Sequence, residues 1–237
     1  MAMTCRLCLE PKPLQNSHIV PEFVYKPIYN AKHQLFGLAG STKVKIFQKG
    51  IREKLLCWDC EQQFSRYEDY AARTLFSPGY SFSTNGPFKV FSRLRYEELK
   101  LFLLSLLWRF GETSLPQLSG ARLGPHHEKL RVLLRAENPG DHTLYACAIT
   151  EVTLNGHVLH QWIIPPKRAR SPEGDIIWNM VIGGYVLTFY VTSHRIPWQI
   201  EPMILNRMGS VGVYISDVRN IPSLMQVGIA MSKVELP

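Results

Sequence analysis

Helical patterns of hydrophobic residues occupy the first part of the chain. Between Cys57 and the Ser-Pro-Gly at 77–79, hydrophobic residues recur at steps of three and four, which predicts an amphipathic helix. Its hydrophobic face consists of Phe64, Tyr67, Ala71 and Leu75. The stretch Tyr96–Phe110 is hydrophobic on most sides, which is typical of a helix buried in the centre of a domain. A further helix is expected over 123–140, because Pro125 stands near its start and a Pro-Gly pair follows it.

From about Leu144 onward the pattern changes to runs of β-branched and aromatic residues. The runs cover 145–154, 157–164, 175–182, 185–192 and 211–216. Asn155-Gly156 separates the first two runs and is a strong signal of a β-hairpin. The basic stretch 165–174 is expected to be a solvated hairpin loop, with contact to phosphates as the alternative. We predict an antiparallel sheet that packs against the helices, which makes the fold class α+β with two or three helices.

The N-terminal third differs from the remainder in its pattern. Residues 1–80 hold four of the five cysteines and short strand-like runs such as Val44–Phe47. Residues 81–237 hold the later helices and the predicted sheet. A chain of 237 residues can form one large domain or two small ones. We expect a cysteine-rich domain over 1–80 and a helix-plus-sheet domain over 81–237.

Two Cys-x2-Cys pairs stand 48 residues apart, Cys5 with Cys8 and Cys57 with Cys60. Four thiolates are a ligand set of structural Zn²⁺, and a pair at a tight turn directs two sulfurs to one ion. The second pair lies at the start of a predicted helix, where the helix dipole favours thiolates. We therefore predict one structural Zn²⁺ site, with an inserted hairpin between the pairs; two unrelated reduced pairs are the alternative. Cys147 lies in a predicted strand and is expected to be a small buried hydrophobe.

Positive charge is concentrated in the first 140 residues. Lys and Arg outnumber Asp and Glu by 11 to 7 in 1–80 and by 9 to 5 in 81–140, whereas both counts are 7 in 141–237. The net charge is +8, and such an excess suits a polyanion such as nucleic acid. No hydrophobic run reaches the ~18 residues that cross a bilayer, and the first residues lack the pattern of a signal peptide. We expect a cytoplasmic protein without a membrane partner.

The order of these motifs resembles that of the HNH, or ββα-metal, nucleases. Cysteine-rich members of that superfamily carry a first Cys-x2-Cys pair, a strand with a histidine followed by Ile-x-Pro, and a second pair at the start of a helix. In this chain CRLC at 5–8, HIVP at 18–21 and CWDC at 57–60 look like these elements. The resemblance covers roughly residues 5–75 and implies a treble-clef zinc finger. Its combination with the remaining chain is similar to bacterial or phage proteins.

The resemblance also implies chemical roles for individual residues. His18 takes the place of the strand histidine that acts as the general base, and Glu61 takes the place of the helix residue that binds the catalytic metal. Glutamate is a suitable oxygen ligand for Mg²⁺ or Mn²⁺. Glu68 lies seven residues further along the same predicted helix, at the edge of its hydrophobic face. The chain departs from the family pattern at Ser17, where the family has an acidic residue, and at Glu61, where it has a histidine.

Two functions from different classes follow from these features. The first is a zinc-stabilised, metal-dependent endonuclease of HNH-like type, which hydrolyses phosphodiester bonds of DNA rather than RNA with His18 as the base. The second is a zinc-finger adaptor without catalysis, which binds nucleic acid or, through its C-terminal sheet, a protein partner. The middle asparagine of the family has no clear match before Cys57, so the adaptor remains an explicit alternative.

Overall fold

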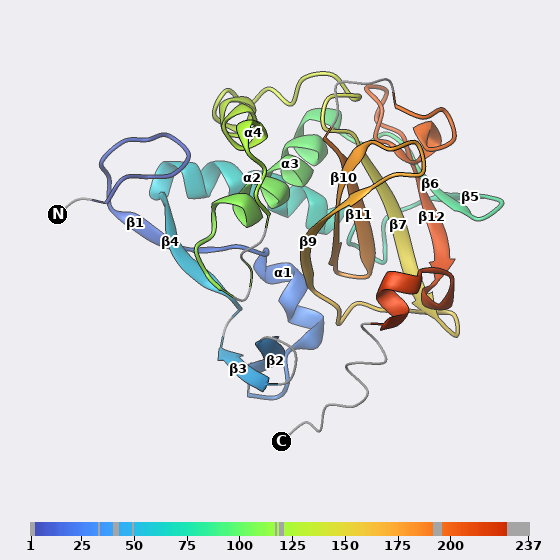
Figure 1. Ribbon diagram of the computed structural model, residues 1–237, viewed down its shortest axis with the longest axis horizontal. Coiled ribbons are helices and arrows are strands. Elements are labelled where there is room, and N and C mark those ends of the chain that lie inside the picture. The colour runs from blue at the N-terminus through green and yellow to red at the C-terminus, as the bar shows by residue number, and fades with distance from the viewer. Residues whose placement is uncertain are drawn as a thin grey trace.

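Helix α3 (Tyr96–Glu112) lies between a small N-terminal unit and a large sheet (Figure 1). The structure is a computed structural model that describes residues 3–32, 34–39, 43–48, 50–116, 118, 121–191 and 196–226, with the backbone alone for 34–39 and 43–48. The side chains of α3 are buried on nearly every side, from Tyr96 to Phe110. The prediction of a central helix over these residues is confirmed, since a helix that is hydrophobic all round is stable only inside a core.

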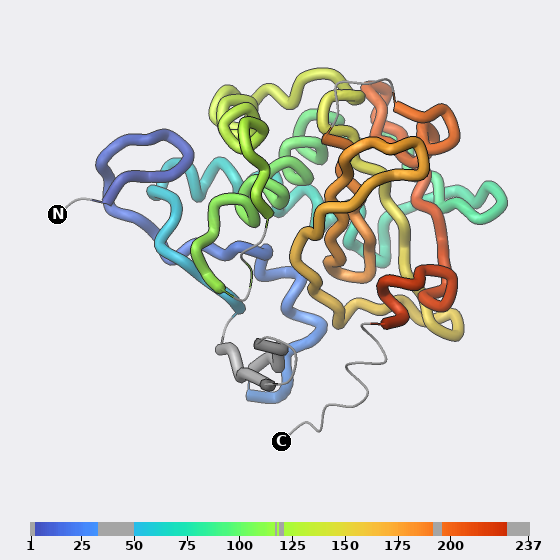
Figure 2. The backbone as a smooth tube through the Cα atoms, in the orientation of Figure 1, coloured from blue at the N-terminus to red at the C-terminus, as the bar shows by residue number. Residues whose placement is uncertain are grey.

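The N-terminal unit consists of a two-stranded ribbon followed directly by a helix. Strand β1 (Leu14–His18) pairs antiparallel with β4 (Arg52–Cys57), and α2 (Trp58–Arg73) continues from β4. Figure 2 shows the two strands side by side although they are far apart along the chain. Between them the chain forms α1 (Glu22–Tyr25), the 3-10 helix η1 (Lys26–Ile28), and a hairpin of β2 (Gln34–Ala39) and β3 (Lys43–Gln48). The inserted hairpin expected between the cysteine pairs is therefore present.

Helix α2 buries the face that its sequence predicts. Phe64, Tyr67 and Ala71 are almost fully buried, and the ring of Phe64 meets Trp108 of α3 edge-on at 5.9 Å between centroids. Edge-to-face contacts of this kind stabilise a pair of aromatic rings beyond the area that they bury. The packing of α2 on α3 thus joins the N-terminal unit to the remainder of the chain.

Helix α4 (Pro125–Arg135) is shorter than predicted. Its last carbonyls accept hydrogen bonds from beyond the helix, at 3.2 Å from Glu137 N to Leu134 O and at 3.1 Å from Asn138 N to Leu133 O. Glu137 takes a left-handed φ of 51°, so the chain ends the helix in a Schellman-type motif. The helical spacing of hydrophobic residues does not reveal this stop, which precedes the Pro-Gly pair.

Eight strands form one large sheet, in the order β5-β6-β12-β7-β11-β10-β9, with β8 also paired to β7. Their bounds are β5 (Ser83–Asn85), β6 (Phe88–Phe91), β7 (Cys147–Leu154), β8 (His157–Val158), β9 (Ile164–Arg170), β10 (Ile176–Ile182), β11 (Tyr185–Tyr190) and β12 (Val211–Asp217). Asn155 and Gly156 turn from β7 to β8 with φ values of 51° and 80°, as a two-residue hairpin turn requires. The α+β class and the hairpin are confirmed.

Four details of the sheet differ from the prediction. Strand β12 runs parallel to β7, because the segment after β11, with η2 (Glu201–Met203), brings the chain back to the same end of the sheet. The segment 83–91, for which the sequence pattern predicts no strand, is a hairpin that extends the sheet. Most of 165–174, expected to be a loop, belongs to edge strand β9. In 157–164 the chain forms the two-residue strand β8 and then turns. The backbone N–H of Trp162 donates to the oxygen of Leu159 at 3.4 Å and closes this turn.

Alternate residues of the sheet enter different hydrophobic clusters. On β7, Cys147 and Ile149 join the largest cluster, which also contains α2 and α3, whereas Ala148 and Val152 face clusters on the opposite side. This alternation is the two-residue period of a strand. The division of the chain at residue 80 stays a prediction, and the largest cluster contains residues from both of its sides. Over the described part of the chain, no helix has the length and hydrophobicity that a membrane crossing requires.

Candidate metal centre

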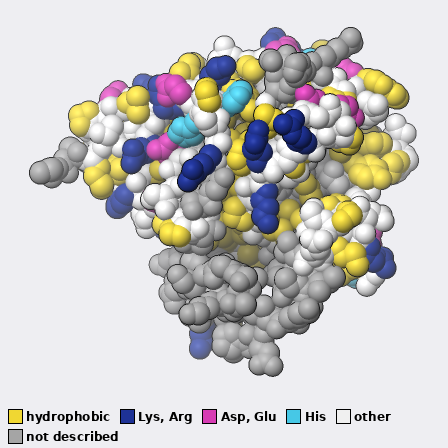
Figure 3. Space-filling view, in the orientation of Figure 1, with side chains coloured by type: hydrophobic (Ala, Val, Ile, Leu, Met, Phe, Trp, Pro, Cys, Tyr) yellow, Lys and Arg dark blue, Asp and Glu magenta, His cyan; other side chains and the backbone are white. Residues whose placement is uncertain are grey.

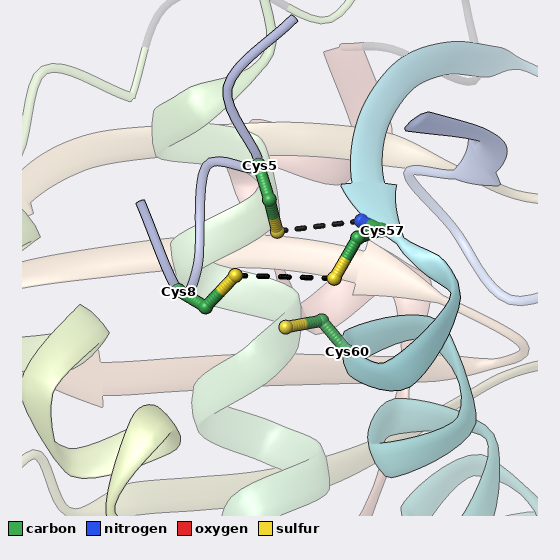
Figure 4. A group of neighbouring side chains, drawn as sticks. All are labelled: Cys5, Cys8, Cys57 and Cys60. Atoms are coloured by element: carbon green, nitrogen blue, oxygen red, sulfur yellow. Dashed lines mark hydrogen bonds between the residues drawn. The ribbon is translucent and has the colours of Figure 1, made fainter. Parts of the chain in front are cut away.

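The four paired cysteines meet at one point of the N-terminal unit. Their sulfur atoms all lie within 4.8 Å of one another. Figure 4 shows Cys5 and Cys8 on the N-terminal loop and Cys57 and Cys60 at the start of α2, with the sulfurs pointing inward. Cys8 and Cys57 have their Sγ atoms 3.8 Å apart. A tetrahedral ion with ~2.3 Å bonds to sulfur separates its ligands by about 3.8 Å, so the group can hold a metal ion.

Backbone hydrogen bonds fix the two halves of this cluster. Within the first half, Leu9 N donates to Cys5 O at 2.9 Å and Leu9 takes a positive φ of 61° to close the turn. Arg6 N donates to Leu55 O of β4 at 3.1 Å, which ties this turn to the strand that leads to the second pair. The N–H of Cys57 donates to the Sγ of Cys5 at 3.3 Å. Amide donors of this kind favour the thiolate form.

The pKa values of the cysteines indicate how a cation would change the ionisation of the four sulfurs. The hydrogen bond from Cys60 lowers the pKa of Cys5 to about 4. The same contact raises the pKa of Cys60, and burial raises the pKa of Cys8. Without a cation, one thiolate in the cluster therefore suppresses ionisation of its neighbours. A bound divalent ion removes this repulsion and allows all four thiolates to form.

Ser17 and Glu61 contact each other directly beside the cysteine cluster. Ser17 Oγ donates to Glu61 Oε2 at 2.7 Å, and Ser17 is only 1% exposed. The backbone N–H of Leu56 on β4 donates to the same hydroxyl oxygen at 3.3 Å. Cys57 ends β4 and Cys60 lies in the first turn of α2, directly before Glu61, so the cluster lies next to this contact. Ser17, where the family has an acidic residue, and Glu61, for which the resemblance implies metal binding, are thus neighbours in space.

His18 lies at the end of β1, opposite Arg52 in the strand register. Arg52 Nε donates to His18 Nε2 at 2.8 Å, so this imidazole nitrogen carries no proton. The ring also lies 6.3 Å from the ring of Tyr25, centroid to centroid. Since neighbouring residues of a strand point to opposite faces, the imidazole and the Ser17 hydroxyl leave the ribbon on different sides.

Glu68 forms an ion pair with a residue that sequence reasoning missed. Arg109 Nη1 of α3 donates to Glu68 Oε1 at 2.6 Å and to the backbone oxygen of His18 at 3.0 Å. The Arg109 side chain is 3% exposed, and its guanidinium also donates to Ser105 Oγ at 3.2 Å and lies 5.4 Å from the centre of the Phe64 ring. Burial raises the pKa of Glu68, although Arg109 opposes this shift.

One signal in the sequence could have indicated Arg109. It stands near the end of the run 101–110, in which Ser105 is the only other polar residue, and a buried arginine requires an anionic or carbonyl partner. The structure therefore brings Ser17 together with Glu61, and His18 together with Arg52. Arg109 joins the backbone oxygen of His18 to the carboxylate of Glu68. The roles proposed for His18, Glu61 and Glu68 stay predictions.

Comparison with protein-family models, with curated proteins and with solved structures gives no match to this chain. The assignment of a function depends for that reason on the chemistry of the residues themselves. Within the described chain, the group Cys5, Cys8, Cys57 and Cys60 has metal-ligand geometry. Any chemistry beyond metal binding therefore depends on the polar residues around Ser17 and His18.

Proposed function

We propose that the chain is a zinc-stabilised, HNH-like endonuclease that hydrolyses DNA phosphodiester bonds with a divalent metal. The observation that carries the proposal is the Ser17–Glu61 contact of 2.7 Å, because it places the helix residue that follows the second cysteine pair against the position where the family has an acidic residue. The order of turn, ribbon and helix around four cysteines is consistent with a treble-clef finger. Zn²⁺ suits this site because soft thiolates in tetrahedral arrangement select it over harder cations.

The proposed chemistry assigns a role to each polar residue. A divalent cation, when bound at Glu61, supplies charge to hold the scissile phosphate and to stabilise the leaving oxygen. Glu61 contributes the oxygen ligand, and Ser17 orients its carboxylate through their hydrogen bond. His18 accepts a proton from the attacking water at Nε2, after Arg52 has withdrawn from that nitrogen. In the structure the Arg52 N–H donates to Nε2 at 2.8 Å and so occupies the lone pair that this step uses.

The alternative function is a zinc finger that binds nucleic acid or protein without catalysis. One observation favours it: Arg52 occupies the Nε2 lone pair of His18, at 2.8 Å, and a base needs a free lone pair toward water. Arg109 also neutralises Glu68, which makes Glu68 a structural partner of α3 under this alternative. Catalysis then requires the Arg52 side chain to withdraw when DNA binds.

Plasmid nicking distinguishes the two functions. Supercoiled DNA is incubated with the wild-type protein, with His18→Ala and with Glu61→Gln, in Mg²⁺ or Mn²⁺. The endonuclease predicts nicking that requires the added metal and that both substitutions reduce by at least about a hundredfold, the usual range for a lost general base. His142→Ala is a matched control, since that histidine lies on the loop before β7 and contacts Asp141 at 3.1 Å.

The outcome that opposes the proposal is equally specific. A wild-type protein that retains zinc and binds DNA in a salt-dependent manner, but nicks no plasmid with either metal, supports the adaptor. Nicking that survives both His18→Ala and Glu61→Gln assigns the activity to other residues or to a contaminant. Zinc content is measured for each variant, so that loss of the finger is not mistaken for loss of chemistry.

A further inference from the structure

Strand β9 forms one edge of the large sheet and carries a concentrated group of cations. Among the described strands it pairs only with β10. Its last four residues are Lys167, Arg168, Ala169 and Arg170, and all four are exposed. Figure 3 shows Lys and Arg side chains over the path of β9, in the middle of the visible face. We call Lys167, Arg168 and Arg170 the β9 cations.

The strand register directs these side chains to both sides of the edge. Arg168 lies opposite Trp178, which packs into the largest hydrophobic cluster, so Arg168 and Arg170 belong to the face that the helices cover. Lys167 lies opposite Asn179 and belongs to the other face. The three cations therefore lie on both faces of the sheet along one strand edge. A polyanion that follows this edge can contact cations from either face.

The β9 cations are not used to neutralise the protein's own carboxylates. No ion pair joins any of them to another residue in the described ranges, and Arg170 Nη1 instead donates to Gly174 O at 2.9 Å. They make up three of the seven Lys and Arg residues in 141–237. The nearby acidic residues Glu173 and Asp175 come after Ser171, toward β10, and leave the outer edge of β9 positive.

The spacing of the cations suits a phosphate backbone. Residues two apart on a strand are separated by about 6.6–6.8 Å, which is the distance from Arg168 to Arg170 along β9. Adjacent phosphates of one strand of B-DNA rise by about 3.4 Å along the helix axis and also rotate around it, which separates them by a similar distance of about 6.5–7 Å. Charged residues also protect edge strands from pairing with other chains, but Pro165 and Pro166 already blunt the first half of β9.

We propose that the outer edge of β9 is a contact surface for the phosphate backbone of duplex nucleic acid. The identity of the partner rests on the proposed function, since DNA is the substrate assigned there. This surface lies far along the chain from the cysteine cluster, on the sheet that the family resemblance does not cover. It gives the C-terminal part of the chain a role in binding the substrate. Phosphate contacts of this kind carry no sequence preference.

The test measures binding rather than cleavage. The affinity for a short fluorescent DNA duplex is determined over a range of KCl concentrations, without added Mg²⁺ or Mn²⁺. The full chain is compared with a variant that combines Lys167→Gln, Arg168→Gln and Arg170→Gln. Each lost phosphate contact lowers the slope of log affinity against log salt by about 0.9, so a loss of about 2 to 3 is expected. At physiological salt the affinity is expected to fall at least tenfold.

A variant with the same change in charge serves as the control. It combines Arg93→Gln, Lys129→Gln and Arg135→Gln, which are exposed residues outside β9. We expect its salt slope to stay within one contact of the wild type. An equal loss of salt slope in both variants would mean that only the net charge matters, and it would overturn the proposal. Circular dichroism and the melting temperature verify that each variant is folded.

Other outcomes also overturn the proposal or separate it from the nuclease assignment. If the slope of log affinity against log salt is unchanged in the β9 variant, the β9 cations do not contact phosphates and instead protect the strand edge from pairing. Competition by polyglutamate as strong as that by unlabelled duplex assigns the surface to acidic polypeptides. A wild-type protein that does not bind the duplex rejects the proposal outright. DNA binding that depends on β9, in a protein that nicks no plasmid, upholds the surface while the nuclease assignment fails.

Discussion

Ser17 on the ribbon donates a hydrogen bond of 2.7 Å to Glu61 on α2. Forty-four residues part them in sequence, and the cysteine cluster lies next to them, since Cys60 directly precedes Glu61 in α2. A carboxylate and a hydroxyl form a weaker cation site than two carboxylates. This pair therefore predicts how a second acidic residue would change metal binding.

Ser17→Asp is expected to create a stronger site for Mn²⁺ at the cost of stability in its absence. Two adjacent carboxylates repel each other at a buried position, which lowers the melting temperature of the metal-free variant. Manganese at about a hundredfold above its dissociation constant should then stabilise the fold by about 3 kcal/mol. The measurement is the melting temperature with and without Mn²⁺, and Ser17→Asn is the uncharged control. An equal response of both variants to Mn²⁺ would contradict a cation position at Glu61.

The cysteine cluster predicts one tightly bound zinc ion per chain. Cys57→Ser should lose this ion and should destabilise the N-terminal unit strongly, because structural zinc contributes on the order of 10 kcal/mol in small fingers. Metal content by mass spectrometry and the melting temperature in the presence of a chelator provide the measurements. Cys147→Ala is the control, since Cys147 lies in the sheet and burial raises the pKa of its thiol to about 12. Zinc that remains in Cys57→Ser at full content would refute the site.

The sequence predicts this cluster well because the signal is local. Each Cys-x2-Cys pair sits at a turn or a helix start, and both turn and helix are encoded within a few residues. The parallel pairing of β12 with β7 is different. It depends on where a segment of twenty residues between β11 and β12 leads the chain, and no alternation of Val211 to Asp217 encodes that path.

The contacts around the candidate catalytic residues could not be predicted from the sequence either, for a related reason. Arg109 meets the backbone of His18 across 91 residues of sequence and Glu68 across 41. Only the packing of α2 on α3 creates these contacts. The polarity of Glu68 suggested a catalytic carboxylate, whereas its partner in space is a buried cation that neither the helix spacing nor the family resemblance includes.

Arg109 predicts a large effect on stability. Arg109→Met retains the volume of the side chain but leaves Glu68 without its cation and the His18 carbonyl without its donor. Removal of one partner of a buried ion pair costs about 3 kcal/mol or more, and we expect that loss in denaturant unfolding. The matched control is Arg66→Met, whose ion pair with Glu137 is exposed and should contribute less than about 1 kcal/mol. Equal effects of the two substitutions would show that Arg109 is not a structural centre of the fold.

Lys100 predicts a rise in stability at alkaline pH. It is 1% exposed, and its Nζ donates to Tyr145 O at 2.8 Å without a described carboxylate as ion-pair partner. Burial lowers its pKa from 10.5 to about 8. Below pH 8 Lys100 is protonated in both the folded and the unfolded chain, and the folded chain is destabilised by the full free-energy cost of burying the charge. Between pH 8 and 10.5 the unfolded chain holds more protons than the folded one, so the free energy of unfolding rises with pH.

The comparison with Lys100→Met isolates this contribution from that of other groups. Methionine never carries the charge, but it leaves the Tyr145 oxygen without its donor. The unfolding free energy of the wild type, minus that of the variant, should increase by about 2–3 kcal/mol from pH 7.5 to 10, as a pKa depressed to about 8 dictates. Urea unfolding at several pH values measures this difference. A difference that stays constant over that range would mean that Lys100 keeps its charge when buried, with its cost met by the carbonyl oxygens alone.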